Sequence, residues 1–191
     1  MTTNIAPLPV RLRELDREAL AAHFLALEAE DRRLRFGSPV GDEAVRAYVR
    51  HIDFSDDGIF AVQDNALKIV AAVHVARTGG SAELGLSVLP GYRGMHLGSV
   101  LFSRAVMYLR NLGIRTVHVH CLAENATMVH IARKNGMQLT SGGSESDGVL
   151  KLAPATPQTH LLEWLADQHA RALQSFRVQA RASRAMLGIP G

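Results

Sequence analysis

The sequence is poor in several features that mark particular classes of protein. Its 191 residues include a single cysteine, Cys121, which excludes an internal disulfide and gives no sign of an oxidising compartment. No apolar run approaches the ~20 residues of a membrane-spanning helix. Residues 1–16 lack the basic start and apolar stretch of a secretory signal. We therefore expect a cytoplasmic protein without a membrane partner.

The chain also lacks a large excess of positive or negative charge. The net charge is +3, an excess too small to indicate a nucleic-acid partner by itself. Hydrophobic residues make up 47% of the chain and charged residues 20%, a composition typical of folded globular proteins. A chain of this length buries roughly 70% of its unfolded surface, so its core needs no metal or disulfide.

Hydrophobic periodicity predicts a layered α+β or α/β domain in residues 1–153, followed by a linker and an amphipathic helix in residues 154–191. A basic loop is expected at residues 31–39 and a second loop at 141–147. The expected strands are 10–15, 59–63, 66–76, 82–88, 114–121, 137–140 and 148–152. The expected helices are 16–30, 42–52, 97–112, 125–136 and 156–186.

One strand-to-helix connection has the composition of an anion site. A strand ends at Val88, a Pro-Gly turn follows, and a helix begins near Leu97. The free N–H groups and the dipole at a helix N-terminus attract phosphates. Gly94 and Gly98 allow close approach of the backbone, and Arg93 adds a positive charge. By itself the pattern also fits a tight connection with no ligand, and it lacks the Gly-Lys-Ser/Thr ending of a nucleotide phosphate loop.

Two segments of the chain resemble the GNAT acetyltransferase superfamily. Residues 82–99 resemble its central strand and pyrophosphate turn, with Arg93 and Gly98 at the first and last positions of Arg/Gln-x-x-Gly-x-Gly/Ala. Residues 121–137 resemble a second segment, an Asn at a helix start followed by Lys-x-Gly-Phe. The matching residues there are Asn125, Lys134, Gly136 and Met137. The resemblance spans residues 8–152 and implies a GNAT-like mixed, mostly antiparallel sheet flanked by helices, with an added C-terminal helix.

The resemblance also implies acetyl-CoA as co-substrate and no metal. In the family the pantetheine arm pairs with the free edge of the central strand, here at Leu86 and Val88, and Asn125 would lie near it. The turn would hold the pyrophosphate through backbone amides. Those amides belong to Arg93, Gly94, Met95, His96, Leu97, Gly98 and Ser99.

The chain departs from the family pattern at two positions. His96 stands where the turn usually has its middle glycine, so a side chain narrows the approach to the backbone. Ala132 stands where many members carry a tyrosine that protonates the departing thiolate. At 100° per residue, His130 is expected on nearly the opposite face of the helix from Asn125, which makes it a poor substitute.

Glu83 is the candidate general base. It alternates with Leu84 along the strand and shares a face with the small residues Gly85 and Ser87, which leaves room for a ligand. The alternative is a solvent-facing or ion-paired carboxylate. His118 and His120 alternate on the next strand, but a third metal ligand is missing, so a polar sheet face is favoured over a metal pair.

Basic and apolar residues elsewhere leave alternatives open. The run Arg32, Arg33 and Arg35 fits either a solvated surface or an attraction for anions. The final helix could pack on its own domain or form a homodimer contact, with nucleic-acid binding a more distant alternative. Its apolar stripe is Leu162, Leu165, Ala166, His169, Leu173, Phe176 and Ala180.

These observations predict an acyltransferase that moves an acetyl group from acetyl-CoA to a primary amine by direct attack in a ternary complex. The amine is a small molecule or a protein lysine, because residues 27–54 faintly resemble bacterial protein-lysine acetyltransferase domains. Two alternatives remain at this point. One is a non-catalytic acyl-CoA-binding regulatory module of the same fold, and the other is a DNA-associated protein that uses the Arg-rich final helix.

Overall fold

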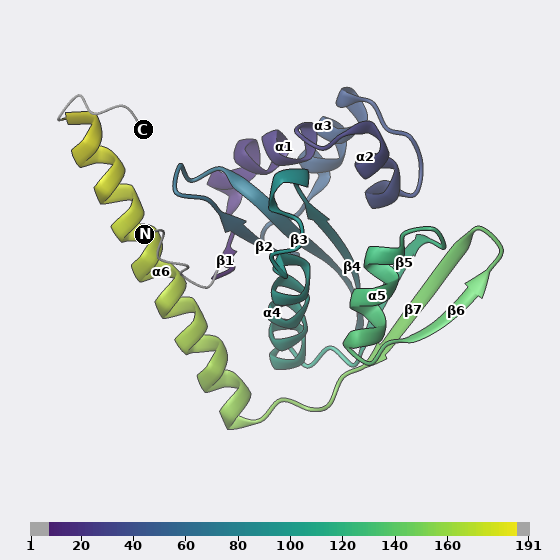
Figure 1. The fold of residues 1–191 in the computed structure, drawn as a ribbon. Coiled ribbons are helices and arrows are strands. Elements are labelled where there is room, and N and C mark those ends of the chain that lie inside the picture. The colour runs from purple at the N-terminus through teal and green to yellow at the C-terminus, as the bar shows by residue number, and fades with distance from the viewer. Residues whose placement is uncertain (1–7, 187–191) are drawn as a thin grey trace.

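The computed structural model describes residues 8–186 and contains one seven-stranded sheet (Figure 1). The strand order is β1-β2-β3-β4-β5-β7-β6. All neighbours pair antiparallel except β4 and β5, which pair parallel, so the prediction of a mixed, mostly antiparallel sheet is confirmed. The strands are β1 Val10–Arg11, β2 Gly58–Gln63, β3 Ile69–Thr78, β4 Ser81–Val88, β5 Thr116–Leu122, β6 Gln138–Gly142 and β7 Glu145–Lys151.

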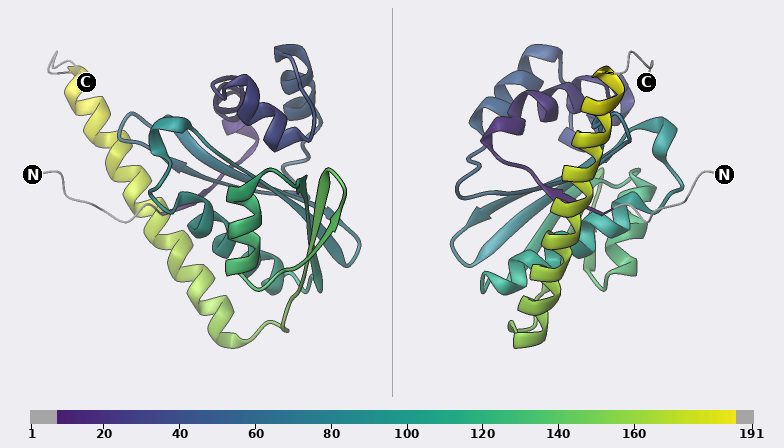
Figure 2. Two further views of the ribbon diagram at one scale, coloured as in Figure 1. Left: turned by 45° about the vertical axis from the view of Figure 1, so that its right-hand side comes forward. Right: turned by 90° about the vertical axis from the view of Figure 1, so that its left-hand side faces the viewer.

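Helices cover both faces of the sheet. Helices α1 and α3 lie on one face and α4 and α5 on the other, while α6 runs along the edge formed by β1 (Figures 1 and 2). Helix α2 contacts β4 and β5. The helices are α1 Arg17–Leu25, α2 Ala29–Phe36, α3 Asp42–His51, α4 Leu97–Asn111, α5 Ala126–Lys134 and α6 Pro157–Met186. Two short 3-10 helices, η1 Glu14–Asp16 and η2 Pro90–Tyr92, precede α1 and α4.

The two faces of the sheet bury separate apolar clusters. Helix α4 contributes the fully buried Leu101 and Phe102 to one cluster. Helices α1 and α3 contribute Leu20, Phe24 and Val45 to the other. Both faces of the central strands are therefore covered, and this fixes the position of β4 and of the turn that follows it.

The sequence prediction for residues 16–39 was wrong in detail. A single helix was expected to reach residue 30, but α1 ends at Leu25 and Glu28 is extended (φ −66°, ψ 159°). A new helix then begins, so most of the predicted basic loop is α2, which ends at Gly37 in the left-handed conformation (φ 77°). Contacts of α2 with β4 and β5 stabilise a short, charged helix that its sequence alone does not predict.

Two strand boundaries also differ from the prediction. Strand β1 ends at Arg11, because the chain turns into η1 and Asp16 Oδ2 accepts a hydrogen bond from the Arg13 N–H at 2.8 Å. Strands β6 and β7 extend through most of the predicted loop and leave a tight turn with Gly143 at φ 68°. Pairing of β7 with the full length of β5 explains the extension, because each added pair satisfies backbone groups.

Helix α6 docks on the domain through its polar face. Arg104 of α4 is 5% exposed and forms ion pairs with Glu163 at 2.9 Å and Asp167 at 2.5 Å. Ala170 is the buried apolar contact. The helix therefore packs on its own domain, one of the two alternatives from the sequence, but its apolar stripe points largely outward, with Leu162 and Phe176 56% and 68% exposed.

Residues 1–7 and 187–191 of the two predicted regions lie outside the described residues, as does the side chain of Ala180. The division of the chain at residue 153 stays a prediction. Over residues 8–186, no helix combines the length and apolar character needed to cross a membrane.

His23 ties α1 to β4. Its Nδ1 lies 3.0 Å from the carbonyl oxygen of Ile69 and its Nε2 lies 2.8 Å from Ser87 Oγ. Because a carbonyl oxygen only accepts hydrogen bonds, Nδ1 carries the proton and Nε2 accepts from the Ser87 hydroxyl. Burial lowers the pKa of His23 to about 4, and the positive charges of Arg35 and Lys68 act in the same direction.

This lowered pKa predicts acid sensitivity. In the unfolded chain the pKa of histidine is about 6.5, so the contribution of His23 to stability is complete above that pH and is lost as the pH falls toward 4. We expect the free energy of unfolding to fall by about 2 kcal/mol between pH 7 and pH 5 through this residue. In urea unfolding, His23→Gln should lose about that much less than wild type, whereas the exposed-site control His160→Gln should follow wild type. Equal losses in all three proteins would contradict this role of His23.

Candidate active site

Strands β4 and β5 separate at the centre of the sheet. Their parallel pairing covers only residues 81–83 and 116–118, and it ends at the pair Glu83 and His118. Within residues 8–186, the rest of β4 has no strand partner on its β5 side. Unpaired backbone groups at such an edge can bind an extended ligand as an added strand would. This is the separation that the resemblance implied for the pantetheine arm.

A cavity of about 470 Å³ opens at this separation. Its wall includes residues 84–88 of β4, the turn after β4, the first turn of α4, the end of β5 and one face of α5. Helix α2 contributes Asp31, Leu34 and Arg35. The cavity thus brings together segments that are far apart in the sequence.

The turn between β4 and α4 presents backbone N–H groups to this cavity. Gly94 has φ 75°, and His96, the residue before α4, is also left-handed at φ 59°, ψ 15°. The first helical hydrogen bond runs from the Val100 N–H to the His96 carbonyl at 3.1 Å. The amides of the preceding residues therefore lack an acceptor within the helix, and they lie at the positive end of its dipole.

The predicted positive charge of Arg93 is partly neutralised by Asp31 of α2. The Arg93 guanidinium forms an ion pair with Asp31 Oδ1 beside the turn. Asp31 Oδ2 is buried and has no hydrogen-bond partner among the described residues. An anion that binds at the turn would therefore compete with Asp31 for Arg93, and this carboxylate is a feature that the sequence analysis missed.

Gly98 lies where α4 packs against α5 as well as beside the turn. A Cβ atom at this position would lie 2.7 Å from Cδ1 of Ile131 on α5. The missing side chain therefore lets α4 and α5 approach each other at the cavity wall. At Gly94, by contrast, a Cβ atom would meet nothing within 4 Å, so this glycine is needed for its positive φ.

Asn125 performs the capping role that the sequence predicted. Its Oδ1 accepts a hydrogen bond from the Met128 N–H at 3.0 Å, and its Nδ2 donates to the Leu34 carbonyl at 3.3 Å. Next to it, Glu124 forms an ion pair with Arg33 at 2.7 Å. These contacts hold α2 against the start of α5, so α2 bridges the two sides of the cavity.

Most of the predicted cofactor residues meet on the wall of this one cavity, but Met95 does not line it. Met95 is 55% exposed, which places its side chain in solvent. Glu83 is also absent from the wall and sits, exposed, where β4 and β5 part. The predicted residues on the wall are Leu86, Val88, Arg93, Gly94, His96, Leu97, Gly98, Ser99 and Asn125.

The expectation for α5 was partly wrong. Ala132 is 1% exposed and belongs to the apolar core rather than to the cavity wall. His130, expected on the far face, is exposed and lines the cavity. The cavity wall includes Thr127, Met128, His130 and Ile131 as well as Asn125, so it is lined by more than the side of α5 that faces Asn125.

For His118 and His120 the sequence favoured a polar sheet face over a metal pair. His118 and His120 stack with ring centroids 6.4 Å apart, and His120 Nδ1 lies 2.5 Å from Asp147 Oδ1. In the described part of the chain, no group of three or more His, Cys, Asp or Glu side chains could hold a metal ion. The alternating histidines instead belong to a polar sheet face.

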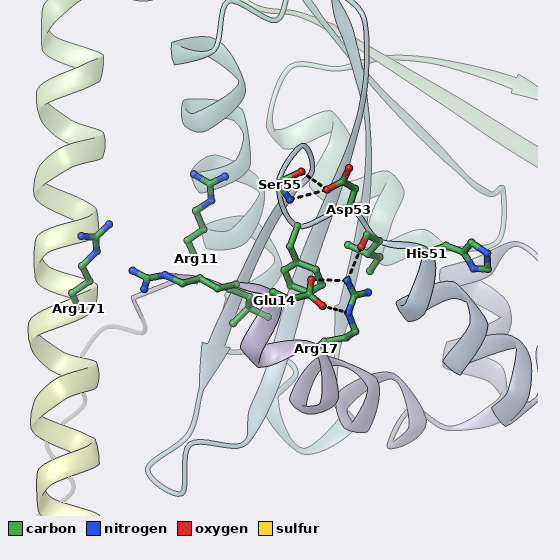
Figure 3. Close-up of a pocket in the computed structure, with 11 residues that line it drawn as sticks. Arg11, Glu14, Arg17, His51, Asp53, Ser55 and Arg171 are labelled. Carbon is green, nitrogen blue, oxygen red and sulfur yellow. Dashed lines mark hydrogen bonds and ion pairs between the residues drawn. The ribbon is translucent and has the colours of Figure 1, made fainter.

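A second cavity, of about 660 Å³, lies beside α6 and is rich in arginine (Figure 3). Two of these arginines already have partners within the protein. Arg17 donates to both carboxylate oxygens of Glu14 at 2.7 Å and to backbone carbonyls at the end of α3. Arg11 donates to Tyr108 Oη at 3.0 Å. This cavity contains none of the residues predicted to bind the acyl donor.

Several solved structures share this fold. The GNAT domain of S. lividans PAT is 20% identical over 75% of this chain and 89% of its own, with a TM-score of 0.65. Spermidine N-acetyltransferase from Vibrio cholerae, solved with CoA and spermine, is 20% identical over 76% and 95%, with a TM-score of 0.60. The ribosomal-protein-S18-alanine N-acetyltransferase from Escherichia coli is 18% identical over 78% and 96%, with a TM-score of 0.57.

The sequence comparison with protein families gives the assignment. No curated protein matches the chain. The acetyltransferase (GNAT) domain matches residues 10–138, a span that starts in β1, ends at the first residue of β6 and contains the whole cavity wall. With the separated central strands and the glycine-containing turn inside that span, the chain belongs to the GNAT acetyltransferase family.

Proposed function

We propose that this protein transfers an acetyl group from acetyl-CoA to a primary amine, by direct attack in a ternary complex. The observation that carries the proposal is that the free edge of β4, the first turn of α4 and Asn125 line the same cavity. A GNAT structure solved with CoA supports an acyl-CoA co-substrate for this family. When bound, acetyl-CoA supplies an activated thioester.

Different parts of the cavity would hold different parts of the donor. The amides of residues 94–99 and the α4 dipole suit the charged diphosphate, whereas the Arg93 N–H already donates to the Pro90 carbonyl at 3.2 Å. The backbone at Leu86 and Val88 suits the amide groups of the pantetheine arm, since a free strand edge offers both donors and acceptors. Asn125 is already engaged as a helix cap, so its contribution would be to position the start of α5 beside that arm.

Glu83 is our candidate for the base. Its carboxylate would accept a proton from the amine, directly or through water, as the amine nitrogen forms a bond to the thioester carbon. The carbon–sulfur bond then breaks and the sulfur leaves as a thiolate, which takes a proton from solvent. A thiol pKa near 8.5 makes that thiolate a fair leaving group without a dedicated acid. The core position of Ala132 is consistent with a mechanism that uses no acid from that residue.

The acceptor is a small amine or a protein lysine. The structural neighbours include enzymes named for spermidine and for the alanine of a ribosomal protein, so the fold alone leaves the choice of amine open. Incubation of the purified protein with acetyl-CoA and a panel of amines and lysine peptides tests the proposal, with free thiol release as the readout. Stabilisation by acetyl-CoA without turnover on any acceptor would favour the non-catalytic acyl-CoA-binding module instead.

We also infer that α6 forms a contact with a second copy of the chain. Its polar face is used by the domain, and its apolar face is left uncovered within the described residues. Leu161, Leu162 and Trp164 are each 56% exposed on that helix. A second α6 offers the same apolar surface, which is the arrangement that two-fold dimers require.

The dimer contact predicts a charge-sensitive assembly. Trp164→Glu should convert a dimer to a monomer in sedimentation experiments, because a carboxylate would be buried in an apolar contact. The control Gln138→Glu adds the same charge at an exposed position of β6, at the opposite edge of the sheet from α6, and should leave the assembly unchanged. A wild-type protein that sediments as a monomer at high concentration would contradict the proposal.

A further inference from the structure

Arg35 of α2 reaches down onto the middle of β4 inside the cavity. A Cβ atom on Gly85 would lie only 2.5 and 2.6 Å from the two terminal nitrogens of Arg35, and closer still to its Cζ. The guanidinium therefore lies directly over Gly85 and occupies the space of the missing side chain. Any larger residue at position 85 would displace it, so the glycine and the arginine form one unit.

The positive charge of Arg35 has no carboxylate partner within residues 8–186. Its Nη2 donates to Tyr48 Oη at 2.9 Å, and its Nε is buried without a hydrogen bond. The rings of Phe24, Phe36 and Tyr48 surround it, with centroids 5.6, 5.1 and 5.6 Å from Cζ. On the same helix, by contrast, Arg32 and Arg33 both pair with acidic residues.

Nearby titratable groups do not compensate the charge. Tyr48 Oη also lies 2.6 Å from His74 Nδ1, and His74 Nε2 lies 3.0 Å from Asp57, so that carboxylate is two side chains away from Arg35. Burial lowers the pKa of His74, and Arg35 acts in the same direction, while Asp57 and the more weakly acting Glu83 oppose it. Arg35 likewise contributes to the lowered pKa of His23. Its charge therefore helps to lower the pKa of two histidines, and it forms no ion pair with a carboxylate among residues 8–186.

Burying a guanidinium without an anion costs desolvation free energy, and a bound carboxylate would lower that cost. A planar guanidinium matches a carboxylate through two parallel hydrogen bonds. Gly85 lies three residues before the end of β4, roughly 10 Å along the strand, so Arg35 is distant from the turn suited to phosphates. We therefore expect the anion that pairs with Arg35 to lie at the end of the cavity where acyl transfer would take place.

We propose that Arg35 binds a carboxylate of a substrate, so that the protein prefers a substrate with an acidic group close to its reacting atoms. This inference rests on the proposed acyl transfer. The carboxylate belongs either to the acyl group, as in malonyl- or succinyl-CoA, or to the amine acceptor, as in an amino acid. Both sources present the same chemistry to Arg35.

Two matched panels separate these sources. The first compares acetyl-, propionyl-, malonyl- and succinyl-CoA with one plain amine. The second compares leucine with leucinamide, using acetyl-CoA as donor. Each panel is run with wild type, with Arg35→Met, which keeps length and removes charge, and with Arg46→Met, a control at an exposed arginine of the neighbouring helix α3. Thermal stabilisation by each acyl-CoA, and by leucine or leucinamide in the presence of CoA, gives a binding readout independent of turnover.

In the panel that contains the true source of the carboxylate, we expect wild type to favour the carboxylate-bearing substrate by about tenfold or more in kcat/KM. That substrate should also give a larger thermal shift. Arg35→Met should lose the preference and Arg46→Met should keep it. Turnover of acetyl-CoA with plain amines but no carboxylate preference would overturn this inference and leave the proposed function intact. Absence of stabilisation by every acyl-CoA would overturn both. The wild-type comparison decides the matter even if Arg35→Met does not fold.

Discussion

Replacing Ser99 with glutamate is expected to abolish the stabilisation of the protein by acetyl-CoA. Ser99 lies in the first turn of α4, lines the cavity and is partly exposed. A glutamate there would place a negative charge where the proposed diphosphate binds. At an effective dielectric constant near 20, like charges ~6 Å apart repel by about 3 kcal/mol, equivalent to more than a hundredfold in affinity.

The Ser99→Glu change should leave the folded protein itself intact. A carboxylate near a helix N-terminus interacts favourably with the dipole, so α4 should be as stable as in wild type. Gly98 is a less selective position to test, because a side chain there would also press on Ile131.

Differential scanning fluorimetry checks this prediction. Wild type with acetyl-CoA at a hundred times its dissociation constant should gain ~2.7 kcal/mol, which corresponds to about 5–10 °C in a chain of this size. Ser99→Gln, with the same shape and no charge, should keep most of the shift. If Ser99→Glu binds acetyl-CoA as well as Ser99→Gln does, the diphosphate is not held at this turn.

Replacing Glu83 with glutamine is expected to lower turnover by roughly a hundredfold or more while acetyl-CoA affinity stays nearly unchanged. Removing a general base typically costs 10²–10⁴-fold in rate. Glu83 lies at the last paired position of β4 and β5, opposite His118, where the cavity begins. It does not line the donor cavity, so its loss should affect the reaction rather than donor binding.

The measurement separates these two effects. Turnover at saturating amine and acetyl-CoA gives the rate, and the thermal shift with acetyl-CoA gives binding. Glu145→Gln changes an exposed carboxylate on β7, which pairs with the edge of β5 opposite to β4, and should retain wild-type turnover. A Glu83→Gln protein that works within twofold of wild type would remove Glu83 from the mechanism.

Local sequence patterns determined the central part of this protein. The alternation through β4, the run into α4 with its left-handed stop at Gly113, and the cap at Asn125 all depend on interactions between near neighbours in the chain. Such interactions can be predicted from residue types at fixed spacing. The turn from Arg93 to Ser99 could be located for the same reason.

Contacts between distant segments decided the rest. Helix α2 is short and charged, and it is positioned by contacts of Leu34 with Asn125, Arg33 with Glu124 and Asp31 with Arg93. No periodicity marks these pairings, because each joins residues many positions apart. The same holds for α6, whose polar face docks through the buried Arg104 although its apolar stripe was the stronger signal.

The position of Arg35 shows most clearly the difference between what local sequence determined and what tertiary packing decided. From the sequence, Arg32, Arg33 and Arg35 are equivalent members of a basic run. Only the packing of α2 on β4 sends Arg35 over Gly85 while its neighbours find acidic partners. Residue types and local spacing thus determined the strand, the turn and the family to which the chain belongs. The tertiary structure alone decided which arginine enters the cavity without a carboxylate partner among residues 8–186, because that depends on how the helix is placed across the open strands.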